Sequence, residues 1–560
     1  MLIYILKYNK ISKRAILHIY YSKDYIINID WLVLSRVKNN INECLCYCVI
    51  NNINMQTSKL KPLFNLVLLS KESIRTAAVA ASADLKSDVD LKSWREIPGP
   101  SSLPIIGQLH HFMPGGQLQS MKNVDGTMKL FDLFGPIVRF DGLLGMPPMI
   151  LLSDPESSAH VLRSENWLPV RPGFKSLEHY RKEYKQNNEH DTGATGLITD
   201  HGDVWKEFRS TVNPVMLQPK TIKLYTAVLD EVAQDMIVRM KANRDEKNMI
   251  INDFDKEMNL WALESIGTVA LGCRLNCFDP NLPADSPEWQ LIQCVHDLFV
   301  IASELDFKPS LWRYFSTPMY KKAMNLYEHH ENLTKHFLEK GKAQLKLKKS
   351  DGEKGVLEKL LEINEEVAHI MASDMLFAGV DTAANTVTAT LYLLASNPEK
   401  QEKLREELLS KSERRPYLKA CIKESLRVMP VVSGNMRLTS KEYNILGYKI
   451  PKNMQVVFAH RDMSLMEENY PRAREYIPER WVAKKDDPLY YGNAHPFAHG
   501  PFGFGARSCI GRRIAELEME AFVARLIENF RVEWSGPPPN VVQASLNYIK
   551  GPYNFIFKDV

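Results

Sequence analysis

One cysteine near the C-terminus stands where a thiolate could act as a ligand or a nucleophile. Cys509 lies in the glycine-rich run PFGFGARSCIGRR, residues 501–513, two residues after Arg507. Glycine permits sharp turns and the close approach of a flat ligand, and backbone N–H groups at a helix start stabilise an anionic sulfur. Apolar positions recur at helical spacing from Ile510 onward, so the loop is expected to open a helix. The run is therefore predicted to hold a thiolate.

A single thiolate narrows the choice of metal. Structural zinc needs about four Cys or His ligands, and the loop offers no second one. Haem iron suits one thiolate, because the porphyrin supplies the in-plane ligands. The run matches the pattern F-x-x-G-x-R-x-C-x-G at every fixed position, and the chain resembles a cytochrome P450. The resemblance implies that Cys509 ligates the iron of haem b, that Phe502 shields the sulfur, and that Arg507 belongs to the haem site.

Other candidate haem contacts lie far from the cysteine in the sequence. Trp205 and Arg209 are four residues apart, which places them on one face of a predicted helix. They resemble the family's W-x-x-x-R motif, and arginine suits a carboxylate through charge-assisted hydrogen bonds. The resemblance implies that both hold a haem propionate. Arg437 matches the position of another propionate-binding arginine of the family.

A long apolar segment, residues 365–396, is predicted to form a buried helix that ends before Asn397-Pro398. Its centre reads AGVDTA, residues 378–383. A hydroxyl that bonds to a backbone carbonyl can open the helix there and leave room for O₂ and water. The segment resembles the family's A/G-G-x-D/E-T-T/S, which implies that Asp381 and Thr382 relay protons to oxygen at the haem. Ala383 departs from the pattern, where a second hydroxyl is common.

A structural motif accompanies these residues. Glu424 and Arg427 are spaced i, i+3 on a predicted helix, and the run PERW follows at residues 478–481. Together they resemble the family's E-x-x-R and P-E-R-F motifs. The resemblance implies a buried triad of Glu424, Arg427 and Arg480, in which Trp481 replaces the commoner phenylalanine and is expected to be tolerated.

A basic patch is predicted on the face nearest the cysteine. Lys419 and Lys423 are one helical turn apart, and Arg512 and Arg513 follow the cysteine loop. Such a patch steers an acidic partner. The runs KACIKESLR and GRRIAELEM resemble the mitochondrial branch of animal P450s. This implies electron transfer from an adrenodoxin-like mitochondrial ferredoxin and its reductase.

Two further segments bear on that branch. The run VNPVMLQPK, residues 212–220, resembles arthropod mitochondrial forms associated with xenobiotic or steroid oxidation. Residues 410–416 form a much shorter connection than most animal relatives have at this point. Either the loop is genuinely short, or coding sequence is missing there.

The chain's composition bounds its organisation. Its 560 residues are 45% hydrophobic and 25% charged, as in ordinary globular proteins, and a net charge of +4 gives no reason to expect nucleic acid. Residues 1–54 lack glycine and proline and are predicted to be a spurious or unstructured extension. Residues 55–93 begin at a methionine and are basic, serine-containing and apolar in stripes, which is typical of a mitochondrial transit peptide. Residues 94–560 are expected to form a single large haem-binding domain, mainly α with a small β-rich lobe.

The connector at residues 307–315, FKPSLWRYF, separates two predicted helices at 286–305 and 317–340. Its apolar, aromatic and basic residues favour a loop in a membrane surface, a lid over a substrate channel, or a piece of core. Peripheral attachment to the inner mitochondrial membrane is the expectation. Residues 171–187 and 286–318 are predicted to line the substrate pocket.

The sequence thus predicts a haem-thiolate monooxygenase that inserts one atom of O₂ into a lipophilic substrate. Two alternatives stay open. One is a haem-thiolate isomerase or peroxide-using enzyme, which needs no external electrons; the pair Asp381 and Thr382 and the basic patch argue against it. The other is a haem-binding sensor or inactive relative whose short 410–416 connection abolishes turnover.

Overall fold

The structure is a computed structural model that describes residues 3–9, 14–22, 25–32, 91–104, 106–119, 125–143, 146–185, 193–250, 254–347 and 352–560. The contacts divide the chain into two units, Met1–Val89 and Asp90–Val560. In the first unit, strands β1 (Ile3–Asn9), β2 (Arg14–Ser22) and β3 (Tyr25–Leu32) form an antiparallel sheet in that order.

Part of the segment predicted to be a spurious or unstructured extension therefore has strand geometry, in keeping with its β-branched and aromatic residues. The predicted transit peptide at 55–93 lies outside the described residues except for its last three positions.

The second unit is mainly helical, as the sequence predicted. Its helices are α2 (Gly126–Phe134), α3 (Pro155–Arg163), α4 (Lys175–His179), the π-helix η4 (Tyr180–Tyr184), α5 (Gly202–Leu217), α6 (Pro219–Lys223), α7 (Thr226–Ala242), α8 (Phe254–Ala270), α9 (Pro287–Asp306), α10 (Pro318–Leu347), α11 (Val356–Ile363), α12 (Glu365–Ala395), α13 (Pro398–Leu409), α14 (Pro416–Val428), α15 (His460–Ser464) and α16 (Arg512–Asn529). Short 3₁₀ turns are η1 (Trp94–Glu96), η2 (Leu109–Phe112), η5 (Pro478–Trp481), η6 (Tyr491–Asn493) and η7 (Gly505–Arg507).

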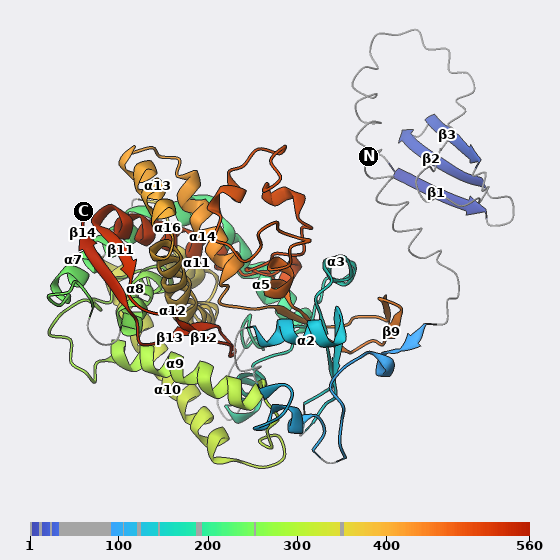
Figure 1. Ribbon diagram of the computed structural model, residues 1–560, viewed down its shortest axis with the longest axis horizontal. Helices are drawn as coiled ribbons and strands as arrows, with labels where there is room; N and C mark the ends of the chain where they lie inside the picture. Colours follow the sequence, from blue (N-terminus) through green and yellow to red (C-terminus); the bar gives the residue numbers. More distant parts are fainter. Residues whose placement is uncertain are drawn as a thin grey trace, which may run out of the picture. The chain divides into compact units, whose positions relative to one another are not determined.

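Helix α12 is the central element of this unit (Figure 1). It packs against α8 along much of its length, with α9 and α10 on one side and α14 and α16 on another. Its threonines satisfy their hydroxyls within the helix; Thr386, for example, donates to the carbonyl of Thr382 at 2.7 Å. This local bonding lets threonines occupy buried positions in an apolar helix. The helix ends at Ala395, one residue before the predicted Ser396.

A small sheet lies beside the helices. Strands β5 (Ile137–Phe140), β6 (Met149–Leu152), β10 (Gln455–Phe458) and β7 (Asn435–Leu438) follow one another in that order, with β10 parallel to β6 and antiparallel to β7. An isolated bridge joins Val170 to Leu438 at the end of β7. This bridge brings the segment before α4 next to Arg437.

The remaining strands form three smaller sheets. They are β4 (Lys92–Ser93), β9 (Tyr448–Ile450) and β8 (Tyr443–Ile445); β11 (Phe530–Trp534) with β14 (Phe555–Asp559); and β12 (Asn540–Val542) with β13 (Tyr548–Lys550).

The short connection at 410–416 is closed by specific contacts. Helix α13 ends at Leu409 and α14 begins at Pro416. The Glu407 carboxylate accepts hydrogen bonds from the backbone N–H groups of Tyr417 and Leu418, both at 2.8 Å. A carboxylate at a helix N-terminus satisfies donors that the helix itself leaves unpaired. The Glu407 side chain thus links the end of α13 to the start of α14 across this short loop.

The connector at 307–315 links α9 to α10 and combines exposed and buried aromatic residues. Tyr314 and Phe315 are 68% and 56% exposed, whereas Trp312 is buried and donates its indole N–H to the carbonyl of Leu305 at 2.9 Å. The loop is therefore anchored at Trp312 and presents the aromatic side chains that follow. Among the described residues, no helix has the length and apolar character needed to cross a membrane.

Candidate active site

The loop before α16 is shaped around the Cys509 thiol. Gly503 and Gly505 have φ values of +74° and +68°, in the region that disfavours other residues. These turns allow the Cys509 N–H to donate to the carbonyl of Phe502 at 2.8 Å. Gly511 has an ordinary φ of −81°, and a Cβ there would stand 3.9 Å from the cysteine sulfur, an ordinary van der Waals contact.

The thiol faces an internal space. Cys509 has exposed surface, yet desolvation by the surrounding protein is the largest influence on it and raises its pKa. The two facts agree if the side chain borders a hollow inside the protein instead of bulk solvent. Backbone N–H groups of Gly511 and Arg512, together with Arg209 and Arg171, act in the opposite direction and lower the pKa. The donors that would stabilise a thiolate are therefore already in place.

Four arginines gather around this thiol, three of them predicted. Arg209 of α5, Arg437 of β7 and Arg507 of η7 are buried, and Arg171 lies in the segment that the Val170 bridge holds beside β7. Burial, with mutual repulsion adding to it, lowers the pKa of Arg507 to about 9 and that of Arg209 to about 10. Burial and then Arg437 lower the pKa of Arg171.

The protein's own acceptors satisfy this cluster only in part. Arg507 donates to the carbonyls of Pro169, Leu197 and Asp200 at 2.7–3.1 Å, and its guanidinium carbon lies 3.8 Å from the centre of the Trp205 ring. Glu165 pairs with Arg437 at 2.7 Å. The indole nitrogen of Trp205 and the Nε of Arg209 are buried and have no partner among the described residues. A further acceptor is thus missing at this point.

The middle of α12 contributes an opening in an otherwise buried helix. Ala378 is exposed and Thr382 is half-buried, whereas Val380, Asp381 and the flanking residues are buried. Thr382 donates to the carbonyl of Ala378 at 2.7 Å, which leaves its oxygen lone pairs able to accept. Gly379 serves packing: a Cβ would meet Ile266 of α8 at 2.7 Å. It lets the two helices approach and is not simply room for O₂.

Asp381, beside this opening, faces His296 of α9. Its Oδ2 lies 3.9 Å from Nδ1 of His296 on α9, and its Oδ1 is buried without a hydrogen-bond partner among the described residues. Burial raises the pKa of this carboxyl to about 6, against the smaller lowering by His296. It can therefore take up and release a proton near neutral pH.

Comparison with known proteins decides the family. The sequence model of the family "Cytochrome P450" matches residues 97–557. The chain is 37% identical over 498 residues to cytochrome P450 CYP12A2 of Musca domestica, which covers 83% of this chain and 92% of the relative. It is 34% identical over 523 residues to probable cytochrome P450 12a5, mitochondrial, of Drosophila melanogaster, covering 88% and 97%. The chain belongs to the cytochrome P450 family.

The fold is shared more widely. A solved structure, retinoic acid bound cyanobacterial CYP120A1, superposes with a TM-score of 0.65 at 20% identity and covers 84% of this chain and all of that chain. The predicted family, fold class and enzyme class are confirmed: this P450 is a haem-dependent monooxygenase, and haem b is its cofactor.

The arginine cluster fits that cofactor. Haem carries two propionate carboxylates, and the unpartnered donors of Trp205 and Arg209 lie in a group of mutually repelling cations. Carboxylates placed there would satisfy those donors and offset the repulsion. Cys509 faces a hollow from a loop that already directs N–H groups at its sulfur. Phe502 borders the loop, with the Arg512 guanidinium 5.3 Å from its ring centre.

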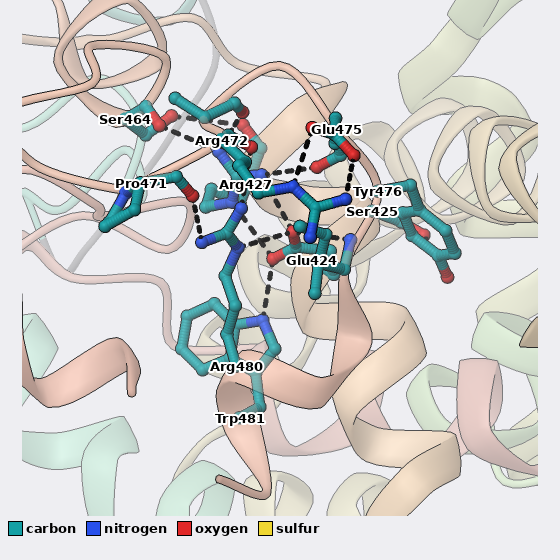
Figure 2. Close-up of polar contacts among 12 residues, drawn as sticks. Glu424, Ser425, Arg427, Ser464, Pro471, Arg472, Glu475, Tyr476, Arg480 and Trp481 are labelled. Carbon is teal, nitrogen blue, oxygen red and sulfur yellow. Dashed lines mark hydrogen bonds and ion pairs between the residues drawn. The ribbon is translucent and has the colours of Figure 1, made fainter. Parts of the chain in front are cut away.

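A buried network in this P450 joins Glu424, Arg427 and Arg480 (Figure 2). All three side chains are fully buried. Arg427 forks onto the Glu424 carboxylate at 2.7 and 2.9 Å, and Arg480 reaches the same carboxylate at 3.1 Å. The remaining donors of both arginines go to backbone carbonyls of residues 464–475. The network thus ties α14 to the segment before η5.

The four predicted partner-binding cations are exposed on α14 and α16. Lys419 pairs with Glu520 at 3.6 Å and Arg512 with Glu516 at 2.9 Å. Lys423 lies 5.7 Å from the Trp481 ring centre, and Arg513 donates to the carbonyl of Leu217. Contacts to a ring and a carbonyl do not neutralise charge, so Lys423 and Arg513 keep the surface positive beside the cysteine loop.

Sequence reasoning missed three participants. Arg171 was assigned only to the pocket wall, and Glu165 was not singled out, because their closeness to Arg437 depends on a bridge between distant segments. Trp481 was treated as a tolerated replacement for phenylalanine. Its indole N–H donates to Glu424 at 2.9 Å, a bond that phenylalanine cannot make. The tryptophan of the PERW run could have indicated this bond, because the indole N–H of a buried tryptophan usually has a hydrogen-bond acceptor.

Proposed function

We propose that this P450 works in the mitochondrion and oxidises a lipophilic xenobiotic or steroid, with electrons from a ferredoxin and its reductase. The observation that carries the chemistry is the Cys509 thiol, which faces an internal hollow next to a cluster of buried arginines. The mitochondrial assignment rests on the 34% identity to a relative named as mitochondrial and on the basic surface beside the cysteine loop.

Each residue has a separate task in this proposal. Bound haem supplies the activation of O₂. Cys509 would hold the iron as a thiolate, and the N–H groups of Gly511 and Arg512 would favour its anionic form. Trp205, Arg209 and Arg437 hold the propionates, and Arg507 braces the loops around them. Thr382 presents its hydroxyl to the hollow, and Asp381 stores the proton that the hydroxyl passes on.

The electron partner should be acidic and should meet α14 and α16. Charge at such a surface acts mainly on the rate of encounter and is screened by salt. Reversing one charge, Lys423→Glu, is expected to raise the KM for ferredoxin several-fold while kcat at saturating ferredoxin changes little. Lys449→Glu, at an exposed lysine of β9, is the matched control and should leave KM unchanged. Equal KM values for the two variants would place the partner elsewhere.

The aromatic connector between α9 and α10 supports peripheral membrane attachment. Tyr314 and Phe315 are exposed beside Arg313, the mix that favours an interface between water and lipid. Replacing both aromatic residues with serine is expected to release the protein from vesicles that contain anionic lipid. Unchanged co-sedimentation of that variant would contradict the assignment.

A further inference from the structure

We propose that His296 is the group through which Asp381 exchanges protons with solvent. The inference rests on the proposed proton-storing role of Asp381 and adds the residue that connects it to bulk water. His296 belongs to α9, whereas Asp381 belongs to α12, and the two helices pack against each other. The side chain of His296 is 50% exposed and that of Asp381 only 6%. The pair therefore spans the boundary between solvent and the interior.

The two carboxylate oxygens of Asp381 differ in their surroundings. Oδ2 faces Nδ1 of His296 at 3.9 Å. Oδ1 is buried and has no partner among the described residues. A distance of 3.9 Å exceeds a hydrogen bond, so transfer needs a small side-chain rotation or one bridging water. Imidazole is suited to this step because it changes charge between about pH 5 and 8 and carries two nitrogen atoms.

Few other charges act on this carboxyl. Asp255, in the first turn of α8, raises the pKa of Asp381, and His296 lowers it; burial exceeds both. On α9, the neighbouring Asp297 forms an ion pair with Lys322 of α10 at 3.9 Å and accepts a hydrogen bond from Gln293. These contacts partly offset its negative charge. Asn385, one turn along α12, donates to the backbone carbonyl of Asp381 and leaves the carboxylate free. Among the described residues, His296 is thus the basic side chain that faces Asp381 across the helix interface.

The proposed step moves only protons. Solvent water protonates the imidazole, Nδ1 of His296 gives a proton to Oδ2 of Asp381, and the carboxyl passes a proton toward the Thr382 hydroxyl and water in the hollow. Each group returns to its starting state when His296 takes the next proton from solvent. The electrons and O₂ of the reaction are those of the established activity.

Three variants test the proposal: His296→Gln, His296→Lys and the control His336→Gln, at an exposed histidine of α10 that contacts Phe337. The first readout uses the resting protein. Infrared difference spectra against Asp381→Asn follow the carboxyl of Asp381 as the pH changes. We expect its titration midpoint to rise in His296→Gln, because a lowering charge is lost, and to fall in His296→Lys, because a permanent cation replaces it. His336→Gln should not move it.

The second readout is turnover with its solvent isotope effect. A relay role predicts that both His296→Gln and His296→Lys lose roughly tenfold in turnover. This is less than the hundredfold or more typical of general acid–base groups, because water substitutes in part. The isotope effect in D₂O should rise in both. If His296→Lys instead restores normal turnover, His296 acts only as a charge and the relay is overturned.

The two proposals can fail separately. If Asp381→Asn keeps full turnover, the proton-storing role of Asp381 is wrong. If Asp381→Asn is impaired while His296→Gln matches the parent protein in midpoint, turnover and isotope effect, only the role of His296 is wrong.

Discussion

Two groups of buried charge in this P450 differ in whether protein atoms complete them. Around Glu424, two arginines and an indole converge on one carboxylate, and backbone carbonyls take the other donors. Around Cys509, four arginines gather and buried donors of Trp205 and Arg209 stay unpartnered among the described residues. Buried charges are stable only when paired and hydrogen-bonded. The first group is therefore a finished structural element, and the second is a binding site that an anionic ligand completes.

The largest effect is expected in the finished group. Glu424→Gln leaves Arg427 and Arg480 buried without their shared carboxylate, which should cost about 3–5 kcal/mol of unfolding free energy. Denaturant unfolding of the haem-loaded protein measures it. Glu518→Gln is the matched control: Glu518 of α16 is also buried, but no cation in the described part of the chain acts on it, and burial raises its pKa.

Glu518→Gln should raise the unfolding free energy or leave it unchanged, because the amide removes no ion pair at position 518. Similar losses for both variants would mean that the network around Glu424 is not what stabilises this region.

A substitution in the incomplete group around Cys509 should weaken haem binding more than it changes the stability of the protein. Arg209→Leu removes a charge-assisted donor, worth about 1.5–3 kcal/mol, so haem should dissociate roughly ten- to hundredfold faster. The haem-free protein should change little, since one of several repelling buried cations is gone. Haem transfer to an excess of apomyoglobin measures the rate.

Arg405→Leu controls for the loss of any buried arginine. Arg405 donates to the carbonyl of Phe530 and lies outside the cluster. The Arg405→Leu variant should lower the unfolding free energy without changing the rate of haem release. The comparison fails if Arg209→Leu destabilises the haem-free protein as much as Arg405→Leu does and leaves haem release unaltered.

The smallest effect is expected for the tryptophan that contacts the finished group around Glu424. Trp481→Phe removes the indole bond to Glu424 and reduces the ring contacts with Tyr491 and His499, so we expect a loss of at least about 1.5 kcal/mol in unfolding free energy. Trp534→Phe, whose exposed indole donates to the carbonyl of Pro537, should stay within about 0.5 kcal/mol. If both variants behave alike, Trp481 acts by packing alone.

Sequence patterns predicted what depends on local spacing. The buried helix of α12, the helix after Cys509 and the helices that flank the 307–315 connector follow from local sequence patterns. Motif resemblance placed Glu424, Arg427 and Arg480, which the structure brings together.

Contacts between distant segments could not be predicted in this way. Arg171 joins the cluster only through the bridge from Val170 to Leu438, and His296 meets Asp381 only because α9 crosses α12. The residue spacing within each segment gives no indication of these contacts. The contact of Gly379 with Ile266 is likewise between two helices.

The central claim is that Cys509 holds haem iron as a thiolate and receives electrons from a ferredoxin. The most direct test is the visible spectrum of the CO complex of the full chain, reduced in turn by dithionite, by a ferredoxin with its reductase, and by a diflavin reductase. The account predicts the red-shifted band typical of thiolate ligation with dithionite and with the ferredoxin system. A band without that shift would contradict ligation by Cys509, and a shifted band with dithionite alone would contradict the ferredoxin route.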